Sequence, residues 1–300
     1  MKYVVTGGAG HISGLVAEKL LAAGKNVTVV GRSAENLKAL TDKGAKADIG
    51  SLEDAQFVKQ TFADADVVYT MIPPNFVTDN YRAYQQKVGR NYYDAIKGSK
   101  ITHLVNLSSV GVQLTDRAGV INGAADFEAL LSTLTDVNVK NLRPGFFFYN
   151  LFSQIPTIKA FGIAGSNYEG TITLPIVDTA DIAEVAVEEL LGLGFTGKSF
   201  RYIASEEMTG NEIATILGTA VGKPDLKWVY VPDEQLKAGM LQGGLTETMA
   251  SNFVQMGQGV NSGELLADYL QHKPVLGKHK LKDFAIGFAA AYNAPAQTGH

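Results

Sequence analysis

Glycines near the start of the chain have the spacing of a phosphate-binding turn. Gly7 and Gly10 follow an apolar run at residues 3–5 and precede a stretch of helical character at residues 12–23. A side chain at either glycine would block a tight bend and hold a bound pyrophosphate away from the backbone amides. The helix would direct its positive end at the same spot, so we expect a dinucleotide phosphate there. The residues that we assign to this contact are Gly7, Gly10, His11, Ile12 and Ser13.

The class of cofactor is indicated by the residues that follow a second strand, predicted at residues 26–30. Gly31, Arg32 and Ser33 come directly after it. An acidic residue at this place would bind the 2′-hydroxyl of NAD, whereas an arginine suits the 2′-phosphate of NADP. We therefore assign Arg32 and Ser33 to the cofactor and expect NADP(H), with NAD(H) as the alternative. Each feature also has a simpler interpretation. The glycines could form a plain strand-to-helix turn, because their spacing departs from G-x-G-x-x-G, and Arg32 could be a solvated arginine at a helix start.

These two stretches resemble a known family. Residues 6–12 (TGGAGHI) and 30–32 (VGR) are similar to the NmrA-like group of atypical short-chain dehydrogenases/reductases, which are relatives of the extended sugar-nucleotide epimerases. Similar stretches continue to about Leu191, and beyond it only the general layout is similar.

The resemblance implies further contacts with the cofactor. Asp48 and Ile49, at the end of a third strand, would lie beside the adenine, with the carboxylate accepting a hydrogen bond from its amine. The ribose side would be lined, after the fourth strand, by Met71, Ile72 and Pro73. On the alternative interpretation, Asp48 or Ser51 only caps a helix at residues 52–62, and the prolines only end the strand.

The resemblance also places the chain near the nicotinamide after a sixth strand at residues 137–142. The residues concerned are Pro144, Gly145 and Phe146. Aromatic residues fill positions 146–149, and they would form either an apolar wall for a flat ring or core between two lobes.

Serines at the end of a fifth strand are the candidate catalytic residues. In the superfamily, a serine at this place hydrogen-bonds the substrate carbonyl and assists a tyrosine acid whose pKa is lowered by a lysine. Ser108 and Ser109 match the place of that serine, and Ser108 is also assigned to the cofactor site.

The tyrosine and the lysine are missing from the helix that should carry them. Aligned on Glu128, which ends the family motif, they fall on Val120 and Ala124, and neither side chain can donate a proton. A Tyr-x-x-x-Lys runs from Tyr93 to Lys97, but it precedes the serine strand, so we interpret it as helix packing. The usual proton transfer is therefore in doubt, whereas cofactor binding is not.

Composition excludes several classes of function. The 300 residues carry a net charge of −4 without a basic stripe, so we expect no nucleic-acid partner. No apolar run approaches the roughly 20 residues of a membrane helix, and Met1 leads straight into a strand, so we expect no membrane association, no cleaved signal and a cytoplasmic location. There is no cysteine, the five histidines are scattered, and no Gly-x-Ser-x-Gly turn occurs. We therefore expect neither a metal site nor a serine hydrolase.

The alternation of strands and helices predicts an α/β fold with a doubly wound parallel sheet and a smaller α/β C-terminal lobe. We assign residues 1–155 to the dinucleotide-binding (Rossmann) domain, to which residues 178–204 return, and residues 156–177 and 205–294 to the substrate-binding lobe. Asp178 and Asp181 have the position of helix caps, and residues 295–300 are expected to be frayed.

Three functions follow from these expectations. The first is an NADPH-dependent oxidoreductase that reduces a small electron-poor molecule such as a quinone or an enone. The second is a redox sensor that binds NAD(P)(H) and acts on a protein partner. A sugar-nucleotide epimerase is the third, and the absence of the tyrosine acid argues against it.

Overall fold

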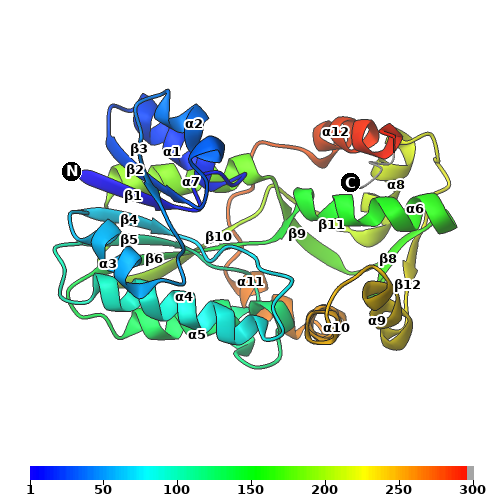
Figure 1. Ribbon diagram of the computed structural model, residues 1–300. Helices are drawn as coiled ribbons and strands as arrows, with labels where there is room; N and C mark the ends of the chain where they lie inside the picture. Colours follow the sequence, from blue (N-terminus) through cyan, green and yellow to red (C-terminus); the bar gives the residue numbers. More distant parts are fainter. Residues whose placement is uncertain (296–300) are drawn as a thin grey trace.

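The chain folds around a parallel β-sheet, and the computed structural model describes it over residues 1–295. Residues 296–300, which belong to the stretch expected to be frayed, lie outside the described residues. The sheet has seven strands in the order β10-β6-β5-β4-β1-β2-β3 (Figure 1). They are β1 (Lys2–Thr6), β2 (Asn26–Gly31), β3 (Lys46–Ile49), β4 (Val67–Thr70), β5 (His103–Leu107), β6 (Asn138–Pro144) and β10 (Lys198–Ile203). Every pair of neighbours is parallel, which confirms the predicted doubly wound sheet.

Helices cover both faces of this sheet (Figure 1). One face carries α1 (Ser13–Ala22), α2 (Ala34–Thr41) and α7 (Thr179–Gly192), and the other carries α3 (Ala55–Phe62), α4 (Tyr81–Ile96) and α5 (Asn122–Ser132). Side chains alternate along each strand, so Tyr3 and Val5 pack toward α1 and α7 while Val4 and Val68 pack toward α3 and α4. All four residues of β4 are buried because both faces are covered.

The start of α3 differs from the expectation. Neither Asp48 nor Ser51 caps this helix: it begins at Ala55, and Asp54 accepts hydrogen bonds from the amides of residues 56 and 57 at 2.9 and 3.2 Å. The Ser51 hydroxyl accepts instead from the Glu53 amide, within the connecting turn. Residues 51–54 are thus used to turn the chain, and Asp48 has no capping role. Asp178 does cap α7, as predicted.

The second lobe is built from two small sheets and the remaining helices. One sheet contains the strands β7 (Phe146–Phe147), β9 (Thr173–Val177) and β11 (Glu206–Thr209). The other sheet pairs β8 (Ala164–Ser166) with β12 (Trp228–Tyr230). Its helices are α6 (Ile155–Phe161), α8 (Gly210–Ala220), α9 (Asp233–Gln242), α10 (Glu247–Asn261), α11 (Ala267–Gln271) and α12 (Leu281–Asn293). Four 3-10 turns complete the fold: η1 (Val112–Leu114), η2 (Gly119–Ile121), η3 (Phe148–Gln154) and η4 (Glu264–Leu266).

The two lobes share a core along the segment between β5 and α5. Val112, Ala118 and Ile121 pack into the core of the second lobe, although the expected division gave them to the first domain. The closest approach is at Gly119, which has φ +59°, and a Cβ there would lie 1.8 Å from the carbonyl oxygen of Asn252 in α10. Only glycine allows η2 and α10 to meet in this way.

Candidate cofactor and active site

The turn between β1 and α1 is shaped by glycines and is open on its outer side. Gly7 has φ +70°, and a Cβ there would lie 2.6 Å from the Met71 sulfur, so this position requires glycine. The Gly10 amide donates to the Gly7 carbonyl at 2.8 Å, which closes the turn. A Cβ added at Gly10 would meet only that carbonyl oxygen, at 3.2 Å. Space is therefore left in front of Gly10 that no protein atom fills.

The N-terminus of α1 fits an anion in that space. No side chain caps the helix at Ile12, and its first turn contains no acidic residue. Buried beneath it, the hydroxyls of Ser13 and Tyr69 make no hydrogen bond among the described residues. Unpaired amides and a positive helix end are the donor set that a pyrophosphate needs.

Arg32 stands free at the end of β2. It is exposed and forms no ion pair among the described residues. Burial raises the pKa of the Tyr84 phenol in α4, as does the charge of Glu53, and the positive charge of Arg32 opposes the rise. Ser33, in contrast, is already used, because its hydroxyl caps α2 by accepting from the Asn36 amide at 3.4 Å.

At the end of β3, Asp48 forms an ion pair with Lys46 at 2.9 Å, so one of its carboxylate oxygens is already paired. Its other oxygen has no partner among the described residues. Ile49 beside it is exposed, which is unusual for a large apolar side chain and leaves a surface on which a flat ring can lie.

Hydroxyl groups fix the backbone at the end of β4. The Met71 amide donates to the Thr6 hydroxyl at 3.0 Å. From α4, the Tyr92 hydroxyl donates to the Met71 carbonyl at 2.8 Å and the Tyr84 hydroxyl donates to the Pro73 carbonyl at 3.0 Å. The predicted cofactor segment Met71, Ile72 and Pro73 is thereby held in place. Sequence reasoning missed both tyrosines, although their spacing of eight residues puts them on one helix face.

A row of polar side chains crosses the sheet just below this edge, and it was also missed. Thr70 donates to the Asn106 side chain at 3.1 Å, and Asn106 donates to the Asn141 side chain at 3.0 Å. The three residues lie side by side on β4, β5 and β6. All three are buried, so their mutual hydrogen bonds are what make a polar row tolerable there.

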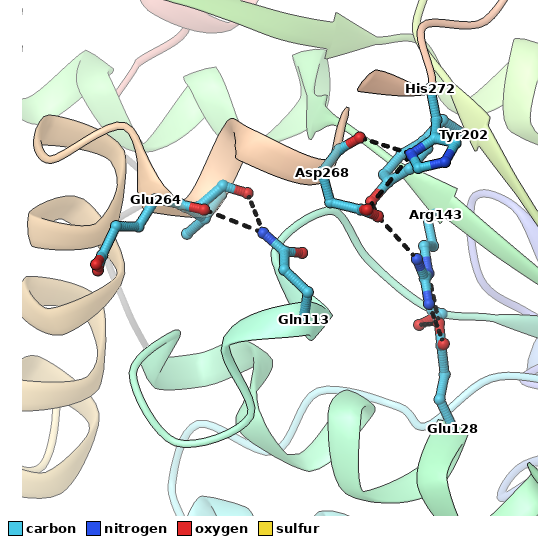
Figure 2. Close-up of polar contacts among 9 residues, drawn as sticks. Gln113, Glu128, Arg143, Tyr202, Glu264, Asp268 and His272 are labelled. Carbon is cyan, nitrogen blue, oxygen red and sulfur yellow. Dashed lines mark hydrogen bonds and ion pairs between the residues drawn. The ribbon is translucent and has the colours of Figure 1, made fainter. Parts of the chain in front are cut away.

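The two serines at the end of β5 have different surroundings. Ser108 is buried, and its hydroxyl donates to Oε1 of Glu128 in α5 at 2.5 Å. The hydroxyl of Ser109 is half-buried and makes no hydrogen bond among the described residues. Arg143 binds both oxygens of Glu128, and Figure 2 shows the continuation of this chain to Asp268 and Tyr202. The proton of Ser108 is therefore engaged, whereas that of Ser109 is available.

The positions of the family tyrosine and lysine contain no proton donor here. Val120 and Ala124 are partly buried and pack against the core of the second lobe. Tyr93 and Lys97 lie at the C-terminal end of α4, toward the start of β5 and so at the opposite edge of the sheet from Ser108. The Tyr93 hydroxyl accepts from Thr133 at 3.1 Å, and its ring packs in the core.

The turn after β6 is tightly packed, and an aromatic row leads away from it. A Cβ added at Gly145 would lie 2.2 Å from the Pro175 carbonyl oxygen, so glycine is needed for β7 to pass β9. Phe146 packs partly in the core of the second lobe. The exposed ring of Tyr149 lies 4.2 Å from that of His11 on the phosphate-binding turn, and Phe152 follows at 5.4 Å. This row joins the turn to the second lobe.

A groove of about 840 Å³ lies between α7, β10 and residues 272–278, and neither the glycine turn nor Arg32 nor the serines at the end of β5 line it. Its charged side chains pair with each other, for example Arg201 with Glu188 and Lys278 with Glu184. We place the site at the carboxyl edge of the sheet instead, because unpaired donors and a free cation are found there. Within residues 1–295, no cluster of side chains could hold a metal ion, and no helix is long and apolar enough to cross a membrane.

Comparison with known proteins finds relatives over nearly the whole length of the chain. The model of the NmrA-like family matches residues 2–269. Among characterised proteins, the NAD(P)H azoreductase of Xenophilus azovorans is 25% identical over 304 residues, which span 97% of this chain and 99% of that protein.

Two solved structures of reductases share the fold. The NADPH-dependent quinone oxidoreductase of Escherichia coli, solved with NADPH, superposes with a TM-score of 0.79 at 18% identity, covering 95% of this chain and 98% of that one. The triphenylmethane reductase of Citrobacter sp., solved with NADP(H), gives a TM-score of 0.77 at 19% identity, covering 96% of this chain and 100% of that one.

Proposed function

The chain belongs to the NmrA-like family, and from this premise we propose that it is an NADPH-dependent reductase of small, flat, electron-poor molecules such as quinones or enones. The observation that carries the proposal is the open turn before the uncapped α1, together with the unpaired Arg32 at the end of β2. A reductase is supported by the azoreductase, the quinone oxidoreductase and the triphenylmethane reductase to which the chain is similar.

Each part of the edge has a role in this proposal. The amides after Gly10, that of Ser13 included, hold the pyrophosphate, and Arg32 holds the 2′-phosphate. The adenine lies at Asp48 and Ile49, and the ribose side lies at the hydroxyl-fixed segment Met71, Ile72 and Pro73. Bound NADPH supplies the hydride. Pro144, Gly145 and Phe146 form a rigid wall beside the place of transfer, because Gly145 is locked against Pro175.

Proton supply is the step that distinguishes this chain from tyrosine-dependent relatives. Ser108 donates its only hydroxyl proton to Glu128, so we assign the contact with the acceptor oxygen to Ser109, whose hydroxyl is unpaired among the described residues. A serine is a weak acid, which suits acceptors whose reduced form is stabilised without strong acid assistance. This restricts the proposed acceptors to electron-poor molecules.

A non-catalytic sensor is the second candidate. It is favoured by one observation: Val120 and Ala124, at the expected acid and lysine positions, are packed against the second lobe. A sensor needs cofactor binding and a protein partner but no acid. The same observation argues against an epimerase, which requires the acid-base tyrosine.

The test is the oxidation of NADPH by the purified protein, followed by absorbance, with a panel of quinones, enones and aldehydes. Turnover of a quinone or enone at about 1 s⁻¹ or faster would be an ordinary enzymatic rate and is the expected result. Tight binding of NADPH without turnover of any compound would instead favour the sensor. Failure to bind NADPH would contradict both.

A further inference from the structure

We propose that η4 and α11, residues 264–271 of the second lobe, position the strand end that carries Ser108 and Ser109, and that Asp268 is the main positioning residue. The inference rests on the proposed function, because it concerns the geometry at the place of hydride transfer. We call residues 264–271 the C-terminal clamp.

The inner contact of the C-terminal clamp is a continuous chain of hydrogen bonds (Figure 2). Oδ2 of Asp268 accepts from Arg143 at 3.1 Å and from the Tyr202 hydroxyl at 2.5 Å. Arg143 then donates to both oxygens of Glu128, at 3.0 and 2.6 Å, and Glu128 accepts from Ser108 at 2.5 Å. Asp268 is thus joined to Ser108 through two intermediates.

This chain is sheltered from water, so its geometry is well defined. The side chains of Arg143 and Glu128 are only 13% and 11% exposed. The guanidinium also stacks on Phe200, 4.1 Å from the ring centre. Burial alone would lower the pKa of Arg143, but Glu128 raises it, and the guanidinium stays charged. Because arginine does not give up its proton, the chain cannot relay protons and acts by holding atoms in place.

The outer contact of the C-terminal clamp holds the segment that follows the serines. Gln113 donates to the carbonyls of Glu264 and Leu265 at 3.1 and 3.0 Å, as Figure 2 shows. Gly111 has φ +89°, and a Cβ there would lie 2.8 Å from Leu265 Cγ, so the backbone passes directly against the clamp. The segment from Ser108 to Gln113 is therefore held at both ends by residues 264–268.

A further contact of the C-terminal clamp carries less weight than the inner one. An exposed ion pair at 2.7 Å, Arg117 with Glu264, adds little because solvent screens it. The inner chain is different: removing the charge at Asp268 leaves Arg143 with one carboxylate partner and replaces the charged acceptor of Tyr202 by a weaker, neutral one. Glu128 and Ser108 can then shift. Such a shift of about 1 Å near reacting atoms reduces rates by up to roughly a hundredfold.

The test compares Asp268→Asn with Asp268→Glu in the full-length protein, with Asp225→Asn as control. Asp225 is exposed in the same lobe and forms no ion pair among the described residues. We expect Asp268→Asn to lower kcat about tenfold and to leave the Kd for NADPH within about twofold. Asp268→Glu should recover part of kcat, since it restores the carboxylate. Asp225→Asn should change neither quantity.

Hydrogen exchange gives a readout that does not need turnover. In Asp268→Asn, the amides of residues 108–113 should exchange faster than in the wild type, while those of β1 and α1 keep their protection. Unchanged kcat and unchanged exchange would overturn the inference. So would a parallel fall in kcat, NADPH affinity and thermal stability, which indicates a general loss of structure. If the wild type binds NADPH without turnover, the proposed enzyme fails, and the exchange at residues 108–113 still decides the inference.

Discussion

The two halves of the sheet's carboxyl edge are built on opposite principles. Where β1 and β2 end, polar groups have no partner among the described residues: the amides before and at the start of α1 and the guanidinium of Arg32. Where β5, β6 and β10 end, the charged groups are paired and covered by the second lobe, as with Arg143 between Glu128 and Asp268. We call these the open half and the covered half. Unpaired groups await a ligand, and paired groups hold the protein's own geometry.

The largest expected effect comes from separating the lobes in the covered half. In Gly119→Ala, the new Cβ would overlap the Asn252 carbonyl oxygen at 1.8 Å, in a backbone of φ +59°. We expect the free energy of unfolding to fall by about 3 kcal/mol or more. Gly24→Ala is the matched control, because Gly24 has φ +71° but no atom within 4 Å of the added Cβ. Chemical denaturation should show a loss of only about 1 kcal/mol there, and equal losses would contradict the packing argument.

Next in size is the effect of Gly10→Ala, which should weaken NADPH binding in the open half without unfolding the protein. An alanine at Gly10 would meet only the Gly7 carbonyl oxygen, at 3.2 Å, so the stability should fall by about 1 kcal/mol or less. The Cβ would occupy the space left for the pyrophosphate, and NADPH should bind about a hundredfold more weakly, or about 2.7 kcal/mol. Titration calorimetry and denaturation measure the two effects. Unaltered NADPH affinity would show that the phosphate lies elsewhere.

A smaller effect on stability is expected at His279, which hydrogen-bonds to Asp181 in α7. Nδ1 of His279 donates to Oδ1 of buried Asp181 at 2.7 Å, and this hydrogen bond raises the pKa of His279 against the effect of burial, with help from Asp178 and Glu184. The pKa of Asp181 is lowered: burial opposes this, but Ser205 and His279 prevail.

The raised pKa of His279 fixes the sign of the pH dependence. Its contribution is fully present below the unfolded pKa of about 6.5 and is lost as the pH rises through the folded pKa. His279→Gln should therefore lower the free energy of unfolding by up to about 1 kcal/mol near pH 6, allowing for solvent screening, and by less near pH 9. The side chain is 43% exposed, which is why the effect is small. A loss that grows with pH would contradict the assignment.

The smallest effect is expected at the Tyr-x-x-x-Lys in the last turn of α4. Tyr93→Phe and Lys97→Ala act at the edge of the sheet opposite to Ser108, so they should change NADPH affinity and any turnover by no more than about twofold. Steady-state kinetics measures this. A general acid supplies roughly a hundredfold or more, so a fall of that size in Tyr93→Phe would mean that we have misplaced the motif.

The open half could be predicted from the sequence because neighbours in the sequence form it. Gly7, Gly10 and Ser13 belong to one turn, and Arg32 follows the next strand, so spacing alone brings them to one edge. The start of α3 was predicted wrongly: the sequence suggested a helix from residue 52 capped by Asp48 or Ser51, whereas the helix begins at Ala55 and is capped by Asp54. Several residues between 48 and 54 could serve as a cap, and only packing selects one.

The covered half could not be predicted in this way. Its contacts join residues far apart in the chain, such as Arg143 and Asp268, which are separated by 125 positions. Ser108 was found from its strand position, but its partner Glu128 was read only as the end of a motif. Nothing local indicates such pairing, because it depends on where the second lobe docks.

The central claim is that the open half binds the phosphates of NADPH, with Arg32 on the 2′-phosphate. It is tested most directly by calorimetric titration of the wild type and of Arg32→Ala with NADPH and with NADH. We predict that the wild type prefers NADPH and that Arg32→Ala weakens NADPH binding by about 1.5–3 kcal/mol while leaving NADH nearly unchanged. Equal affinity of the wild type for the two cofactors, or no binding of either, would contradict the claim.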